Sequence, residues 1–235
     1  MFNLNFKIMF KKNLVITVIV AFFATMGTLV AQEKYAILIG GNMNPDDLVI
    51  PETEQWNGGQ GGSLEYGFDE FWNDTYLNWE MLVFHKEYTD ENVHVLFNDG
   101  DDFTFYLQDD RYKASSHPGY LSLTDNNSNR QTIINKFTTL ASTITEDDFL
   151  FVWIMGHGGS DATGHYFYSY DNHKIYDTDL AGWLNGIAAH KKTVFLSFPN
   201  SGGFVPELES DDIIIITNGG QQKAQAGRMI LPQMG

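Results

Sequence analysis

The stretch "DDFLFVWIMGHGG", residues 147–159, contains the strongest strand signal in the chain. Every position from Phe149 to Met155 is apolar, which is typical of a central parallel strand buried under helices on both faces. The apolar run ends abruptly in Gly-His-Gly-Gly at 156–159. In open α/β sheets the functional residues lie beyond the carboxyl ends of the strands, so this polar loop is a candidate site.

The rest of the chain alternates between strand and helix signals. We expect strands at 34–39, 93–97, 193–198 and 213–217, helices capped by Asp69 and Asp177, a helix over about 129–141, and a small hairpin within 165–176. The order predicts an α/β fold with a mostly parallel central sheet and helices on both faces. No internal repeat or second globular domain is visible in the sequence.

The first 31 residues have the order of a secretory signal peptide. Lysines at 7, 11 and 12 precede an apolar stretch at 14–23, and small residues then lead to Ala31, with no acidic residue among them. We therefore expect cleavage after Ala31 and a single domain over 32–235. The alternative is a retained membrane anchor, although the apolar stretch is short for a full span. No other segment is apolar enough to suggest a stable span after cleavage.

The chain is strongly acidic and contains no cysteine. Its formal net charge is −16, and removal of the leader, with its three lysines and no acid, would make it −19. Such a charge repels nucleic acid and anionic lipid, so neither is an expected partner. The absence of cysteine rules out disulfides and every thiolate mechanism. An exported chain without disulfides fits the bacterial periplasm, cell surface or medium.

A second unusual loop, "SFPNSGGF" at 197–204, follows the expected strand that ends at Phe198. Between His157 and Pro199 lie the expected hairpin and one helix, which is enough chain for a crossover between two parallel strands. If these strands are neighbours, the two loops meet at one edge of the sheet. His157 and Pro199 then belong to one candidate site.

From "DDFLFVWIMGHGG" to "IIIIT" the chain resembles the caspase-fold cysteine peptidases, the superfamily of caspases, legumain and gingipains. Its members carry an apolar strand, then His-Gly, and roughly 40–50 residues later a strand that ends in the nucleophilic cysteine. The bacterial legumain-like members are most similar, because they read Cys-x-Ser-Gly-Gly-Phe where this chain has Ser-Gly-Gly-Phe at 201–204. The resemblance includes "KYAILIGG" at 34–41 and extends over about 33–225.

The resemblance implies a caspase-like three-layer sandwich and a set of inherited site positions. His157 corresponds to the catalytic histidine, and the backbone N–H groups of Gly158 and residue 199 correspond to the oxyanion donors. Ser201 corresponds to the serine of the motif, which the family does not use as its nucleophile. The catalytic cysteine itself corresponds to Pro199, and there the chain departs from the family.

Proline at position 199 removes two parts of the catalytic apparatus. It has no side chain that attacks a carbonyl, and it has no backbone N–H to donate to an oxyanion. Loss of one such donor alone slows catalysis by about 10²–10³. The sequence therefore predicts a peptidase-like protein that is not an enzyme and that binds a peptide or another protein. The alternative is an active hydrolase in which Ser197 or Ser201 has become the nucleophile and His157 is the base.

Two clusters of polar residues suggest metal sites that we consider weaker alternatives. "NDGDD" at 98–102 contains oxygen ligands suited to calcium, but its order does not match the known calcium loop. Histidines and aspartates around the hairpin (Asp161, His165, Asp171 and His173) have no known zinc spacing. We therefore predict no metal and no cofactor, and the sequence leaves the oligomeric state open.

Overall fold

The computed structural model describes residues 32–40, 69–102 and 119–220. The chain divides into two compact units, Met1–Gln32 and Glu33–Gly235, and all elements named below belong to the second. The expected signal peptide lies outside the described residues. None of the described helices is both long and apolar enough to cross a membrane.

The strands are β1 (Lys34–Gly40), β2 (Val93–Phe97), β3 (Phe149–Met155), β4 (Gly158–Ser160), β5 (His165–Tyr168), β6 (Lys174–Tyr176), β7 (Lys191–Ser197) and β8 (Ile213–Thr217). The helices are α2 (Asp69–His85), α3 (Arg130–Thr143), α4 (Asp177–Asn185) and α5 (Val205–Leu208), with short 3₁₀ segments η3 (Asp90–Asn92) and η4 (Ser201–Phe204).

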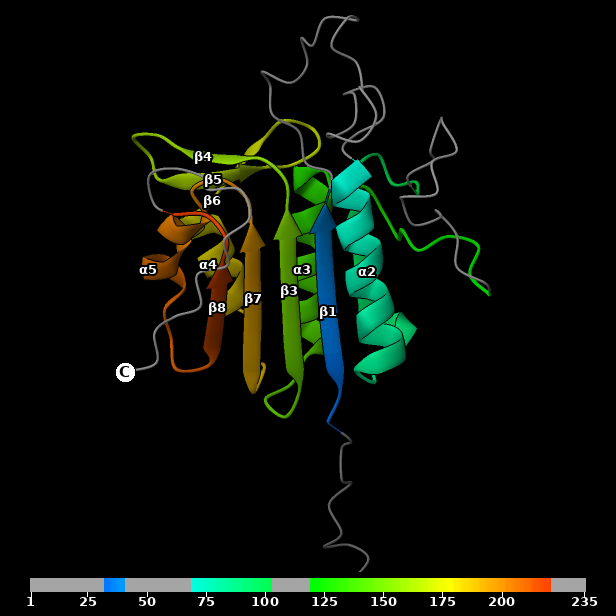
Figure 1. Cartoon of the computed structure of the whole chain (residues 1–235). Coiled ribbons are helices and arrows are strands. Elements are labelled where there is room, and N and C mark those ends of the chain that lie inside the picture. Colours follow the sequence, from blue (N-terminus) through cyan, green and yellow to red (C-terminus); the bar gives the residue numbers. More distant parts are fainter. Residues whose placement is uncertain (1–31, 41–68, 103–118, 221–235) are drawn as a thin grey trace, which may run out of the picture. The chain divides into compact units, whose positions relative to one another are not determined.

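A five-stranded sheet in the order β2-β1-β3-β7-β8 forms the centre of the domain, and all its strands are parallel (Figure 1). Helices pack on both faces, so the domain is a three-layer α/β sandwich and the predicted fold class is confirmed. The strand order places β3 between β1 and β7. The apolar stretch that opened the sequence analysis is therefore the central strand.

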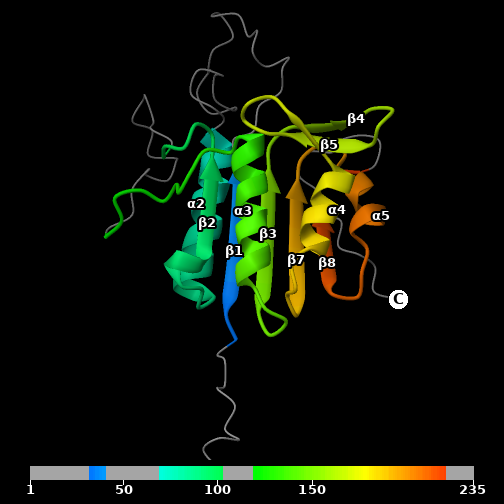
Figure 2. The same cartoon turned by 180° about the vertical axis from the view of Figure 1, so that it is seen from behind.

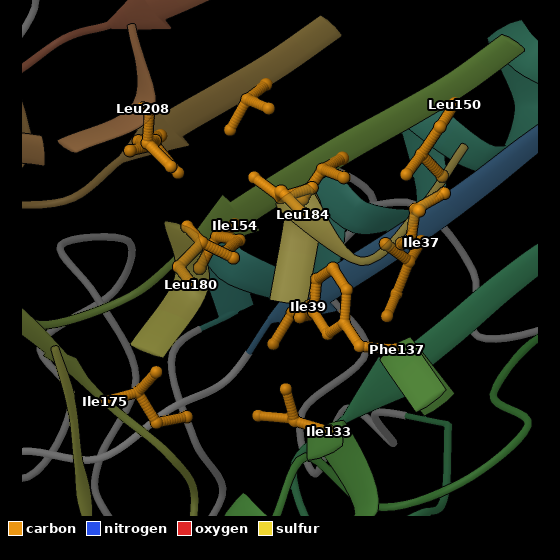
Figure 3. Close-up of a cluster of buried hydrophobic side chains, with 14 of the residues drawn as sticks. Ile37, Ile39, Ile133, Phe137, Leu150, Ile154, Ile175, Leu180, Leu184 and Leu208 are labelled. Carbon is orange, nitrogen blue, oxygen red and sulfur yellow. The ribbon is translucent and has the colours of Figure 1, made fainter. Parts of the chain in front are cut away.

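One face of the sheet is covered by α3, α4 and α5. Alternate residues of β1 and β3, such as Ile37 and Ile154, point to this face and pack against Phe137 of α3 and Leu180 of α4 (Figures 2 and 3). The strands supply every second side chain to this cluster because side chains alternate across a sheet. This cluster is the larger of two hydrophobic cores.

The other face is covered by α2, which packs on β1 and β2 (Figure 1). Here the expectation that β3 is buried on both faces is only partly correct. Phe149, Phe151 and Met155 of β3 are half-buried, and Ile214 of β8 is 53% exposed. Among the described residues, no helix lies over β7 and β8 on this face, so that half of the sheet is less covered than its apolar sequence suggests.

A second, antiparallel sheet of three strands lies beyond the carboxyl ends of the central strands (Figure 1). The expected hairpin is formed by β5 and β6. The prediction of a loop directly after β3 is wrong in part, because Gly158–Ser160 form the strand β4, which pairs with β5. Asp177 is the first residue of α4 and not its cap; the cap is Tyr176, whose N–H donates to the Asp179 carboxylate at 3.1 Å.

The buried Asp148 ties together the amino ends of β1 and β3. Its carboxylate accepts hydrogen bonds from the N–H of Glu33 (2.9 Å) and from the N–H and hydroxyl of Thr145 (both 2.8 Å). Burial raises the pKa of Asp148, but these three donors outweigh burial and hold the pKa below its usual range. The charged form of Asp148 therefore stabilises the folded chain.

Replacing Asp148 with asparagine should destabilise the domain by about 1–3 kcal/mol, because an amide loses the charge and one acceptor. The contribution of a carboxylate with a lowered pKa is fully present above its unfolded pKa, near 3.9, and disappears as the pH falls through the folded pKa. Urea unfolding should therefore show a deficit for Asp148→Asn at pH 7 that shrinks below about pH 4. The exposed neighbour Asp147→Asn is the control. An equal effect of the two variants at pH 7 would refute this role.

Candidate functional site

The parallel pairing of β3 and β7 brings the two unusual loops together, as the sequence predicts. Met155 and Ser197 are the last paired residues of these strands. Just beyond them, the N–H of Gly156 lies 3.4 Å from the carbonyl oxygen of Ser197. A Cβ atom on Gly158 would lie only 2.8 Å from the carbonyl oxygen of Pro199. The two loops are thus in direct contact at the carboxyl edge of the sheet.

The half-buried His157 is positioned by two other elements. Its ring packs edge-on against Phe71 of α2, with ring centroids 5.5 Å apart and an interplanar angle of 66°. Its carbonyl oxygen accepts a hydrogen bond from the N–H of Tyr168 at 3.0 Å. Phe71, which belongs to the hydrophobic core on this face of the sheet, therefore also packs on the histidine of the candidate site.

Pro199 occupies the second position of a tight turn. The N–H of Ser201 donates to the carbonyl of Phe198 at 3.2 Å, and Asn200 has the left-handed conformation with φ 64°. This is the pattern of a type II turn, which favours proline at its second position and glycine or asparagine at its third. The second residue of such a turn donates no turn hydrogen bond, so the missing N–H of Pro199 leaves the turn intact.

The two serines proposed as alternative nucleophiles are both in structural hydrogen bonds. Ser201 is fully buried, and its Oγ accepts the N–H of Gly219 at 3.1 Å. The Oγ of Ser197 accepts a hydrogen bond from Nδ2 of Asn218 at 2.6 Å. Ser201 therefore ties its loop to the segment after β8, and its hydroxyl offers no exposed surface to a substrate.

A histidine–aspartate pair beside this loop was not identified from the sequence. The Nδ1 of His165 lies 3.4 Å from Oδ2 of the buried Asp177, which also accepts the N–H of His165 at 3.1 Å. The His165 ring packs directly on Gly203, where an added Cβ would lie 2.2 Å from ring carbons. The pair fastens the small sheet to η4. Nothing in the local sequence marks Asp177 as buried, because Thr178 and Asp179 follow it.

Three tyrosines line the outer face of the small sheet, because side chains alternate along β5 and β6. Phe167 and Ile175 point inward and are fully buried, whereas Tyr166, Tyr168 and Tyr176 are half-buried. The ring of Tyr166 lies 5.2 Å from that of Tyr168 and 5.7 Å from that of Tyr176. A Cβ on Gly159 would touch the Tyr166 hydroxyl at 2.8 Å, so this tyrosine surface continues from the His157 loop.

Charged residues at the edge of the tyrosine surface are arranged as a small network. Nζ of Lys174 lies 4.2 Å from the centroid of Tyr166 and 2.6 Å from the carboxylate of Asp161, which also accepts the Tyr176 hydroxyl at 3.1 Å. The hydrogen bond from Lys174, with help from the Thr163 N–H, lowers the pKa of Asp161 to about 2. The network holds the rings of Tyr166 and Tyr176 in place.

Several of the residues proposed as metal ligands have other partners. The carboxylate of Asp102 accepts the N–H groups of Leu123 and Thr124, at 3.0 and 2.8 Å. Around the hairpin, His165 pairs with Asp177 and His173 with Asp171, at 3.4 and 3.7 Å. Within residues 32–40, 69–102 and 119–220, no group of three or more histidine or acidic side chains is arranged to hold a metal ion.

Comparisons with known proteins add little to this geometry. No family model and no curated protein matches the chain. Among solved structures, the protein GSU0716 from Geobacter sulfurreducens is similar with a TM-score of 0.44 and 14% identity. The match covers 74% of this chain and 53% of that one, so this chain spans about half the length of GSU0716.

The contact between the two loops predicts that Gly158 cannot carry a side chain. In Gly158→Ala the new Cβ would lie 2.5 Å from Cδ2 of Phe198 and 2.8 Å from two backbone oxygens, so the loops must separate. We expect a loss of about 1–3 kcal/mol in thermal or urea unfolding. In the control Gly182→Ala, on α4, nothing lies within 4 Å, and that helix should gain about 0.5–1 kcal/mol. Unchanged stability of Gly158→Ala would mean that the loops are not in contact.

Proposed function

We propose that this protein is a non-catalytic relative of the caspase-fold peptidases that binds a peptide or a protein segment at the carboxyl edge of its sheet. The observation that carries the proposal is the turn at Pro199, in contact with the loop of His157. The signal-like leader and the cysteine-free composition support export to a bacterial periplasm, cell surface or medium.

The geometry argues against catalysis in three ways. Position 199 has neither a nucleophilic side chain nor an N–H group for an oxyanion. Ser201 is fully buried and bonded to Gly219, and Ser197 is bonded to Asn218. A base such as His157 contributes little without a nucleophile within hydrogen-bond reach. The rival interpretation, a serine hydrolase, would therefore have to use Ser197, which is half-buried and already accepts a hydrogen bond from Asn218.

The tyrosine surface is the feature that favours binding. Tyrosine is enriched at protein interfaces because it combines a large apolar ring with a polar hydroxyl and loses little conformational freedom. Here Tyr166, Tyr168 and Tyr176 stand half-buried beside the two loops, and their rings are fixed by one another and by the Asp161–Lys174 network. Rings that are already ordered cost little further entropy when a partner packs on them.

The absence of turnover is tested with fluorogenic peptides that carry Asn, Asp, Arg or Lys before the reporter. We expect the wild-type signal to equal that of His157→Ala, since the site has no nucleophile. A serine-reactive fluorophosphonate should label neither Ser197 nor Ser201. Turnover that disappears in His157→Ala, or labelling of either serine, would contradict the proposal and favour the hydrolase.

Binding is tested by selecting peptides from a displayed random library against the purified protein. Selected peptides should lose about ten-fold or more in affinity for Tyr166→Ala, which removes the ring shared by both tyrosine contacts. Leu121→Ala is the control, because Leu121 is fully exposed and its neighbours Tyr120 and Leu123 pack with the core under α2. Peptides that bind both variants equally, or a selection that yields no peptide, would overturn the assignment of this surface.

A further inference from the structure

A hollow of about 330 Å³ lies at the opposite edge of the sheet from the candidate site. Its lining includes the first residues of β1, β3 and β7 (Lys34, Phe149 and Lys191), so it opens at the amino ends of these strands. It lies between α2 and the strands β3 and β7, since residues of all three elements line it. Its volume is at the lower end of the range for small-molecule sites.

The interior of the hollow is mainly apolar. Phe149 and Phe151 are alternate residues of β3 and form its floor, and Met81 and Leu82 of α2 form one wall. Both phenylalanines are half-buried and Met81 is 36% exposed, so their apolar surface is open to solvent. An apolar chain laid against these side chains would remove that surface from water.

Lysines are among the residues that line this hollow, although the protein is acidic. The described basic residues are Lys34, Lys86, Arg130, Lys136, Lys174, Lys191 and Lys192. Three of these seven, Lys34, Lys86 and Lys191, line the hollow. The whole chain has a formal net charge of −16, so the lysines at this apolar hollow contrast with the negative charge of the protein.

The charges of these lysines are only weakly compensated. Nζ of Lys34 donates to the carbonyl of Lys86 at 2.9 Å, and Nζ of Lys191 donates to the carbonyl of Asp211 at 2.7 Å. Carbonyls are neutral, so both bonds orient the ammonium groups without cancelling their charge. The acid that pairs with Lys34 is Glu87, at 3.4 Å and with its side chain 91% exposed, and so exposed a pair contributes little.

We propose that this hollow binds a fatty carboxylate, a small molecule with one unbranched apolar chain and one anionic head. The chain lies on Phe149 and Phe151 beside α2, and the carboxylate lies at the mouth among the three lysines. The positive charge of the lysines favours an anionic head over a neutral or cationic one. The apolar side chains of the floor favour a ligand with an apolar chain over a compact anion such as acetate. This binding is independent of the function proposed for the opposite edge.

Isothermal titration of the purified protein with decanoate tests the proposal. Mass spectrometry of the same sample establishes whether the expected leader has been removed. Decanoate should bind with a dissociation constant that rises with salt, because exposed charges are screened. Decanol, which has the same chain without the charge, should bind about ten-fold more weakly or not at all. Equal binding of the two, or no binding of decanoate at 1 mM, would overturn the proposal.

Two matched pairs of variants locate the site. Met81→Glu places a negative charge on the wall and should weaken decanoate binding about ten-fold or more, whereas Leu77→Glu, one turn earlier on α2 and 44% exposed, should not. Lys191→Gln should weaken binding about two- to five-fold, and Lys136→Gln on α3 should have no effect. Binding that is insensitive to both Met81→Glu and Lys191→Gln would place decanoate elsewhere and refute the assignment.

Discussion

The in-register parallel pairing of β3 with β7 is the constraint on which the candidate site depends. It runs from Phe149 opposite Lys191 to Met155 opposite Ser197, so the two strands end together and their loops begin side by side. A shift of one residue would turn every side chain to the other face and separate Gly158 from Pro199. The buried side chains of both strands fix the register, because half of each strand must face the core of α3 and α4. Packing in the core thus positions the surface loops.

In the function proposed above, Pro199 removes catalytic groups from the candidate site and leaves the backbone of its turn intact. At the second position of a type II turn, proline fits the backbone and the missing N–H is not needed for the turn. In the proposed relationship, a caspase-fold peptidase has a nucleophilic cysteine and an oxyanion-donating N–H at this position, and proline supplies neither. The neighbours are compatible with this conformation: Asn200 supplies the left-handed third position, and Ser201 anchors the loop to Gly219. Proline at position 199 is therefore compatible with the backbone of this turn.

Strands of the central sheet were predictable because each is a short apolar run bounded by polar or glycine residues. The bounds of β2, β3 and β8 are those that the sequence suggests. The strand β4 was missed because "GGS" has no apolar pattern, and its pairing depends on β5 rather than on its own side chains. The partial exposure of one face of β7 and β8 was also missed. The sequence shows that these residues are apolar, but it does not show whether a helix covers them. Pairs such as His165 with Asp177 depend on tertiary packing that local patterns do not contain.

The cysteine-free chain allows one direct measurement of whether His157 and position 199 share a site. In Pro199→Cys the introduced thiol is unique, and its rate of alkylation by iodoacetamide is followed from pH 5 to 9. If His157 lies beside it, the thiolate should form at a lower pH than the usual value near 8.5, and His157→Ala in the same background should restore the ordinary profile. Leu121→Cys gives the profile of a fully exposed thiol. Identical profiles with and without His157 would contradict the account.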